Sequence, residues 1–173
     1  MKNALIVVDY QQDFVSGTLG FPGAEALDAP IAQAVENYRA QGWDIIYTLD
    51  THFEDYMDTV EGQKLPISHC IKGTDGHALY GQVAQSRKDG DAVFEKVTFG
   101  SMELATYLSA KNYNHVILCG LVAHICVLSN AVLAKAALPE SRIAVAADLT
   151  LSPDPADKER ALAALTGVHV EIL

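Results

Sequence analysis

The sequence predicts an α/β fold in which helices cover both faces of a six-stranded parallel sheet, a doubly wound three-layer sandwich. Short apolar runs alternate with helical stretches along the whole chain. The runs are apolar throughout rather than alternating with polar residues, as expected for strands that are buried on both faces. The chain has 173 residues with no internal repeat and no linker, so we predict a single domain over residues 1–173.

Each predicted element has its own local signal. Six short aliphatic or β-branched runs predict strands at residues 4–8, 44–49, 92–95, 116–118, 143–147 and 168–173. Helical patterns between them predict helices at residues 24–39, 79–86, 101–110, 126–138 and 156–165. Turn and cap residues mark the helix ends: Pro22-Gly23 precedes the first, Ser101 and Asp154 are expected N-caps, and Gly167 ends the last.

The composition restricts the classes of function. Lys and Arg number 12 against 22 Asp and Glu, so the formal net charge is -10. A surface that binds nucleic acid without sequence preference needs an excess of Lys and Arg, so we predict no nucleic-acid partner. No run approaches the roughly 18 apolar residues that span a bilayer, and the N-terminus lacks the cleavage site of a secretory signal. Three cysteines without paired spacing indicate free thiols, and we therefore predict a cytoplasmic protein with no membrane partner.

Polar and reactive side chains collect where the predicted strands end. Asp9, Asp50 and Lys96 each follow an apolar run, and a turn from Gly120 leads to Cys126. In parallel α/β sheets the ligand binds beyond the carboxyl ends of the strands, so we expect these side chains to meet there. Each residue alone has a structural explanation, as a turn cap, a surface lysine or a small buried thiol. Together, acids, a base and a thiol at one sheet edge predict a catalytic site.

Cys126 is the predicted nucleophile of this site. It follows a strand and a glycine-containing turn, and it begins a strongly apolar helix. The positive end of the helix dipole is expected to lower the pKa of a thiol at this position. The backbone N–H groups of a helix start can also stabilise an oxyanion.

The chain resembles a known family over essentially its whole length. Five motifs in order carry the resemblance: ALIVVDYQQDF, YTLDTH, HCIKGTDG, EKVTFGS and CGLVAHICV. Their characteristic residues are Asp9, Asp13, Phe14, Asp50, His52, His69, Lys96, Gly120 and Cys126. With these motifs the chain is similar to the isochorismatase-like cysteine hydrolases, which include the nicotinamidases. The resemblance implies a six-stranded parallel sheet and an Asp-Lys-Cys triad.

The resemblance also implies a mechanism. Asp9 would take the thiol proton and later activate water, Lys96 would orient Asp9, and Cys126 would form a thioester with the substrate carbonyl. Members that cleave isochorismate lack the cysteine, so its presence here implies a small amide as substrate. The family has a cis peptide bond ahead of the nucleophile, which corresponds to Leu121–Val122. The N–H groups of Val122 and Cys126 are then expected to form the oxyanion hole.

The predicted substrate contacts are Phe14, Phe99 and Leu121. Nicotinamidases enclose a pyridine ring between aromatic side chains, and Phe14 corresponds to one wall while Phe99 is a candidate for another. An aromatic residue usually stands at the position of Pro66, so the substrate stays open between nicotinamide, another small amide and a carbamoyl or ureido compound. His124 stands where the family commonly has an acid, and it either contacts substrate or packs below the helix start. A catalytically silent binding domain is the alternative from another class.

The long loop over residues 51–76 and the strand end before it carry a predicted metal site. By resemblance, Asp50, His52 and His69 are ligands of a divalent metal, with Glu61 as the fourth. Mixed nitrogen and oxygen ligands suit zinc, manganese or iron, and we predict no organic cofactor. A solvated acidic loop without metal is the alternative, and three other residues compete with Glu61: Glu54, Asp55 and Asp58.

Members of the family often form dimers or tetramers, so we predict a homo-oligomer. The apolar helix at residues 126–138 offers a surface for a partner subunit, although burial inside the molecule explains its composition equally well.

Overall fold

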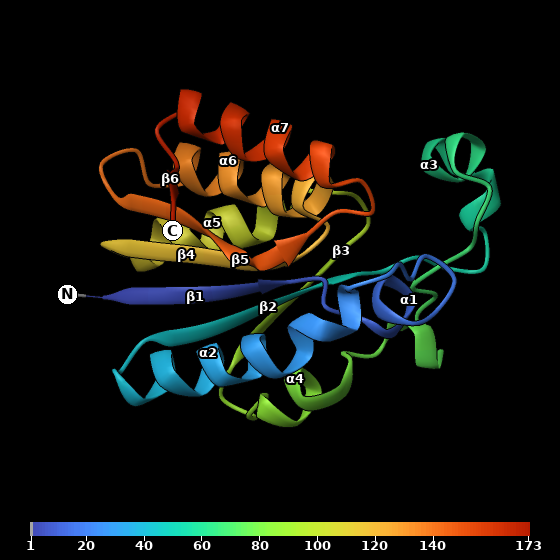
Figure 1. Ribbon diagram of the computed structural model, residues 1–173, viewed down its shortest axis with the longest axis horizontal. Coiled ribbons are helices and arrows are strands. Elements are labelled where there is room, and N and C mark those ends of the chain that lie inside the picture. Colours follow the sequence, from blue (N-terminus) through green and yellow to red (C-terminus); the bar gives the residue numbers. More distant parts are fainter. Residues whose placement is uncertain (1) are drawn as a thin grey trace.

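A computed structural model describes residues 2–173, which form one six-stranded parallel sheet between two layers of helices (Figure 1). The strands follow the order β3-β2-β1-β4-β5-β6 across the sheet. Their bounds are β1 Asn3–Val8, β2 Asp44–Asp50, β3 Ala92–Lys96, β4 His115–Leu121, β5 Arg142–Leu151 and β6 Glu171–Ile172. Every pairing between neighbours is parallel. The predicted fold class is therefore confirmed.

The helices divide between the two faces of the sheet (Figure 1). One face is covered by α2 (Asp28–Ala40) and α4 (Gly81–Ser86), and the other by α5 (Met102–Lys111), α6 (Leu128–Ala137) and α7 (Pro155–Gly167). The packing of strand β4 explains why successive residues in its middle are all apolar. Val116 and Leu118 are buried with α5, α6 and α7, whereas the alternate residues Ile117, Cys119 and Leu121 are buried with α2 and α4.

Shorter helical segments complete the chain. They are α1 Gln12–Val15, the 3-10 helices η1 Ala24–Leu27, η2 Tyr56–Asp58 and η3 Asp75–His77, the helix α3 Val60–Lys64, and the π-helical turn η4 Ala123–Val127. The loop over residues 51–76 carries η2 and α3 away from the body of the sheet (Figure 1). No helix among residues 2–173 combines the length and the apolar character needed to cross a bilayer.

Several element bounds differ from the predicted ones. Strand β4 begins one residue before the predicted 116–118 and extends to Leu121, because hydrogen bonding to β1 and β5 continues past the apolar run. The last strand is shorter than the predicted 168–173, since Val168 and His169 close the turn after α7 on the carbonyls of Leu165 and Thr166. Helix 126–138 is split into the turn η4, which starts at residue 123, and α6.

The sheet changes direction between β1 and β4. The chain runs outward from β1 through β2 to β3, and then returns to the other side of β1 for β4, β5 and β6. Such a switch point opens a crevice at the carboxyl ends of the two central strands. Gly120 permits the close pairing there: its φ is 104° and a Cβ atom would lie 2.1 Å from the Val8 carbonyl oxygen. Asp9 and the turn after β4 are thereby placed side by side.

Candidate active site

Lys96 lies at the centre of a buried group of charges at this switch point. Its Nζ atom is 2.6 Å from Asp9 Oδ2, 3.1 Å from Asp50 Oδ1 and 3.5 Å from Cys126 Sγ, and it donates to the Thr98 carbonyl at 3.0 Å. Burial acts to lower the pKa of Lys96, but the charges of Asp9, Cys126 and Asp50 together outweigh it and the pKa is raised. The side chain is therefore an ammonium that holds the two carboxylates and the thiol together.

Asp9 follows the last residue of β1 and adopts a φ of 46°, which aspartate tolerates better than most side chains. The Thr48 hydroxyl donates to its Oδ1 at 2.6 Å, and its own N–H donates to the Thr48 carbonyl at 3.2 Å. The contact of Oδ2 with Lys96 is an ion pair whose angles fall outside those of a hydrogen bond. Burial raises the pKa of Asp9, while Lys96 opposes that shift. Oδ2 is thus the carboxylate oxygen that accepts no hydrogen bond from the described residues.

Cys126 lies in the π-helical turn η4. The turn is closed on the Val122 carbonyl, which accepts from Ile125 N at 3.1 Å and from Val127 N at 3.2 Å. The cis peptide bond predicted at Leu121–Val122 is confirmed. Burial raises the pKa of the Cys126 thiol well above its ordinary value, with Asp9 adding to the shift and Lys96 opposing it. This differs from the lowered pKa expected at a helix start, because the thiol is desolvated, so a base must remove its proton.

An apolar cavity of about 220 Å³ opens in front of the thiol. Among its lining residues are the two aromatic side chains predicted to contact substrate, Phe14 and Phe99, together with Val122 and Cys126. Leu121 differs from the prediction. It is fully buried in the core beside α2 and is absent from the lining, because alternation along β4 turns its side chain away from the cavity.

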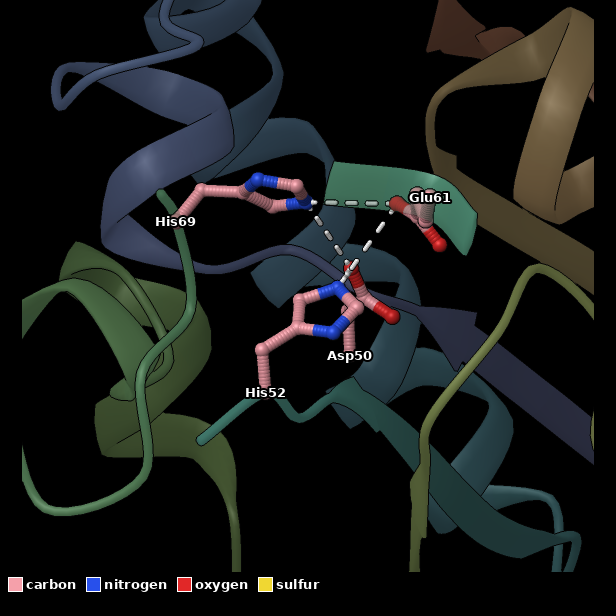
Figure 2. Close-up of side chains that lie close together, drawn as sticks. All are labelled: Asp50, His52, Glu61 and His69. Carbon is pink, nitrogen blue, oxygen red and sulfur yellow. Dashed lines mark hydrogen bonds and ion pairs between the residues drawn. The ribbon is translucent and has the colours of Figure 1, made fainter. Parts of the chain in front are cut away.

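The four predicted metal ligands form a second cluster (Figure 2), and three of them, Asp50, Glu61 and His69, also line this cavity. Asp50 Oδ2 lies 3.1 Å from His52 Nε2 and 3.4 Å from His69 Nε2, and Glu61 Oε1 lies 3.7 Å from each of the two imidazole nitrogens. Ligand atoms around a tetrahedral zinc ion, each about 2.1 Å from the metal, lie roughly 3.4 Å apart. The spacing of the cluster therefore fits a divalent cation.

The hydrogen bonding of His69 also fits a cation. Its Nδ1 atom lies 2.8 Å from the Ile67 carbonyl oxygen, which only accepts, so Nδ1 carries a proton. In the neutral imidazole, Nε2 then presents a lone pair to the carboxylate oxygens of Asp50 and Glu61. Because a lone pair and carboxylate oxygens repel one another, a metal ion or a second proton is needed between Nε2 and these oxygens. Burial lowers the pKa of His69, but the bond with Asp50 and the other contacts outweigh it and the pKa is raised.

The pKa values of the two carboxylates in this cluster shift in opposite directions. Burial raises the pKa of Asp50, yet the bonds to His52 and His69 and the charge of Lys96 outweigh it, so the pKa is lowered. Burial and the charge of Asp50 raise the pKa of Glu61. Of the four acidic residues that competed for the fourth position, only Glu61 lies in the cluster, because the Thr59 side chain caps α3 and places it at the start of that helix.

Comparison with known protein families shows which family the chain belongs to. The model of the isochorismatase domain matches residues 3–173, which is nearly the whole chain. The chain belongs to the isochorismatase family. Among curated relatives, an uncharacterised isochorismatase family protein PncA of Bacillus subtilis (strain 168) is 31% identical over 144 residues, which cover 76% of this chain and 78% of that protein.

Solved structures of family members share the fold closely. The pyrazinamidase/nicotinamidase of Streptococcus mutans UA159 superposes with a TM-score of 0.88 at 28% identity, covering 99% of this chain and 100% of that one. The N-carbamoylsarcosine amidase of Thermoplasma acidophilum superposes with a TM-score of 0.81, also at 28% identity, covering 99% and 95%. The isochorismatase fold of the chain is therefore shared with enzymes named for two kinds of amide.

Two residues that support the site had no role in the sequence analysis. Gln11 is fully buried: its Oε1 accepts from Asp50 N at 2.7 Å, and its Nε2 donates to the carbonyls of Asp50 and His77 at 2.9 Å each. Thr48 holds Asp9, as described above. A glutamine two residues after the predicted base and a threonine inside an apolar strand were the only sequence signals for these contacts.

His124 and the segment around Pro66 are also placed by the structure. His124 lines the cavity, and its Nδ1 atom lies 2.8 Å from Ser152 Oγ. At the position where the family commonly has an aromatic wall, Pro66 is absent from the lining and its neighbour Leu65 contributes instead. The cavity therefore has two aromatic walls from Phe14 and Phe99, with aliphatic side chains between them.

Proposed function

We propose that the protein is a cysteine amidase that hydrolyses the C–N bond of a small amide. One observation carries the proposal: an acid, an ammonium and a thiol from three separate strand ends meet at hydrogen-bond range beside an apolar cavity. Asp9, Lys96 and Cys126 are the proposed triad. A thiol with a raised pKa needs an adjacent base to become nucleophilic, and Asp9 Oδ2 is that base.

In the first step the thiol proton moves to Asp9 as Sγ bonds to the amide carbon. The carbonyl π electrons move to oxygen, and the resulting oxyanion accepts hydrogen bonds from Val122 N–H and Cys126 N–H. The tetrahedral intermediate then collapses. Its C–N bond breaks, the nitrogen takes the proton from Asp9, and ammonia or an amine leaves a thioester on Cys126.

Water completes the cycle in the second step. Asp9 accepts a proton from water while the water oxygen bonds to the thioester carbon, through a second oxyanion held by the same two N–H groups. The C–S bond breaks, and the thiol of Cys126 recovers its proton from Asp9. The products are a carboxylic acid and the free enzyme. Lys96 remains protonated throughout, and its ammonium stabilises the negative charge that moves between the sulfur of Cys126 and the carboxylate of Asp9.

The cavity favours a flat ring as the substrate's acyl part. Phe14 and Phe99 offer two aromatic faces, and the volume of about 220 Å³ suits a one-ring carboxamide. The relative named as a pyrazinamidase/nicotinamidase supports nicotinamide or pyrazinamide. A carbamoyl compound is the second candidate, because a relative of the same 28% identity is named as an N-carbamoylsarcosine amidase.

We further propose that Asp50, His52, Glu61 and His69 hold a divalent cation, which can be zinc, manganese or iron. The spacing of their ligand atoms and the lone pair of His69 Nε2 support this assignment. When bound, such an ion supplies a Lewis acid that can orient a ring nitrogen or carbonyl of the substrate. Gln11 positions Asp50 for this role through its hydrogen bonds with the N–H and the carbonyl of Asp50.

Ammonia release from nicotinamide, pyrazinamide and a small ureido amide tests the function. Release from a ring carboxamide, lost in Cys126→Ala, is the expected result. Release only from the ureido compound would favour the second candidate. No release from any of the three would indicate a catalytically silent binding domain.

A homo-oligomer, a single domain and a cytoplasmic location remain predictions. Sedimentation velocity of the purified protein tests the first of them. The apolar face of α6 supports an interface less than its sequence suggests, because Ala131 and Ala134 are buried within the molecule, although Val132 is exposed.

A further inference from the structure

Asn130 is a buried polar side chain in the mostly apolar helix α6. Only 1% of it is exposed, yet its amide group is fully engaged. Its Oδ1 accepts from Ser101 N at 3.0 Å, and its Nδ2 donates to the Phe99 carbonyl at 3.1 Å and to the Cys126 carbonyl at 2.8 Å. All three partners are backbone groups, and they belong to two segments of the proposed active site.

The first of these segments is the loop over residues 97–101, which joins β3 to α5. It places Phe99 in the wall of the cavity, and its Thr98 carbonyl accepts a hydrogen bond from Lys96. The loop lies directly against α6, since a Cβ atom on Gly100 would be 2.7 Å from Leu133 Cδ1. The second segment is the turn η4, which carries Cys126.

We propose that Asn130 is a positioning residue that joins these two segments and so sets Lys96 and Phe99 against the Cys126 thiol. The inference rests on the proposed cysteine amidase function. A carboxamide offers one acceptor and two donor hydrogens in a fixed plane, which match one N–H and two carbonyl groups. An aspartate of the same shape would place its charge against the two carbonyls, and an apolar residue would leave all three backbone groups unpaired.

Three variants separate a positioning role of Asn130 from a general loss of stability: Asn130→Ala, Asn130→Ser and Leu108→Ala. Leu108 is a fully buried core residue of α5 without contact to the cavity, so its variant reports the effect of a weakened core alone. A serine hydroxyl in a helix can donate to the carbonyl four residues earlier, which here is that of Cys126, but it cannot bridge to the loop. The measurements are the rate of Cys126 alkylation by iodoacetamide at pH 7.5, with Cys126→Ala as background, and kcat and KM for the best amide of the panel.

In Asn130→Ala we expect alkylation to slow by about tenfold and KM to rise by about tenfold, the factor that one lost hydrogen bond can produce. Asn130→Ser should keep most of both losses, because its hydroxyl can hold only the Cys126 carbonyl while the loop that carries Phe99 and accepts from Lys96 stays released. Leu108→Ala should change neither value by more than about twofold at temperatures where it is folded.

Two outcomes would overturn the proposal. In the first, the alkylation rate and KM of Asn130→Ala both stay within twofold of those of the unmodified protein. In the second, Leu108→Ala changes the alkylation rate and KM as much as Asn130→Ala does. Failure of the proposed function itself is distinguished in the unmodified protein, where Cys126 would then alkylate like an ordinary thiol and no amide would be hydrolysed.

Discussion

At the scale of single residues, the site is organised by one positive charge between two negative ones. Lys96 contacts Asp9 through Oδ2 and Asp50 through Oδ1, and it is only 4% exposed. Asp50 presents its other oxygen to His52 and His69. The proposed triad and the proposed metal ligands are therefore linked through a single carboxylate, and the removal of Lys96 takes away the ammonium that both buried carboxylates share.

Lys96→Met tests this charge balance. The methionine side chain has a similar length but no charge, so we expect the free energy of unfolding to fall by about 3–5 kcal/mol and amidase activity to be lost. Urea denaturation measures the change in stability. Lys72→Met is the matched control: Lys72 pairs with Glu95 at the surface, and its loss should cost less than about 1 kcal/mol. Similar costs for the two variants would contradict the prediction.

Thr48→Val tests the role of Asp9 through pH. The Thr48 hydroxyl bonds to the ionised carboxylate and so lowers the pKa of Asp9; without it that pKa rises further. The base form then appears only at higher pH, and the acidic limb of kcat/KM should move up by about one pH unit. Thr51→Val, which removes a hydroxyl bonded to the Leu49 carbonyl and His77, should leave the limb in place. A limb that moves down would contradict the assignment of Asp9 as base.

At the scale of secondary structure, the site depends on how closely β1 and β4 approach. Their carboxyl ends present Asp9 and the turn η4, and Gly120 pairs with Val8 where the two strands end. The turn itself is π-helical, so its first hydrogen bonds converge on the Val122 carbonyl. The separation of the two strands and the shape of this turn together decide where the thiol lies.

Gly120→Ala should disturb both stability and the site. A Cβ atom would meet the Val8 carbonyl oxygen, and the φ of 104° is unfavourable for alanine, so we expect a loss of at least about 2 kcal/mol in urea denaturation. Gly90→Ala is the control, because a Cβ atom there meets nothing within 4 Å. Its effect should stay within about 0.5 kcal/mol. A stability of Gly120→Ala equal to that of the control would contradict the close approach.

At the scale of the whole molecule, the cation cluster joins the projecting loop to the sheet. Asp50 ends β2, His52 lies at the start of the loop, His69 lies in its second half, and Glu61 comes from α3 between them. An ion held by all four residues would therefore fix the loop to the sheet and stabilise the folded chain by mass action. Metal occupancy should be visible in global stability as well as in activity.

Chelation of the proposed metal should lower the thermal midpoint by about 5–10 °C, for an ion present at 100 times its dissociation constant. Differential scanning calorimetry of metal-loaded and chelated protein measures this shift. His69→Ala should remove most of this shift, although the loss of a buried side chain and of its contact with Asp50 lowers the chelated midpoint as well. Equal midpoints with and without metal, at measured occupancy, would contradict the site.

The affinity for metal should also fall as the pH is lowered. The raised pKa of His69 means that a proton occupies its Nε2 below that pKa, where His69⁺ stabilises the metal-free fold through Asp50. That contribution is lost as the pH rises through the raised pKa, and the ion then takes the place of the proton. Titration calorimetry at pH 8 and pH 5.5 should show weaker binding at the lower pH; equal affinity would exclude His69 as a ligand.

Much of the fold followed from the sequence because its signals are local. Apolar runs without alternation indicated buried parallel strands, and Asp9, Asp50 and Lys96 stood directly at their ends. Parallel strands deliver such residues to one edge whatever their separation in the chain. The chemistry of the candidate site was therefore predictable in its residue types and its location.

The contacts that refine this site depended on packing between distant segments, which no local pattern encodes. Only the tertiary structure selected Glu61 among four acidic residues, turned Leu121 into the core and buried Cys126 so deeply that its pKa rises. It also supplied partners for Thr48 and Asn130, which lie in mostly apolar stretches of the sequence. The sequence by itself determined the fold class and the reactive residue types, because periodicity and strand ends are local properties; the tertiary structure decided their partners, burial and charge state, because those are set by residues far away in the chain.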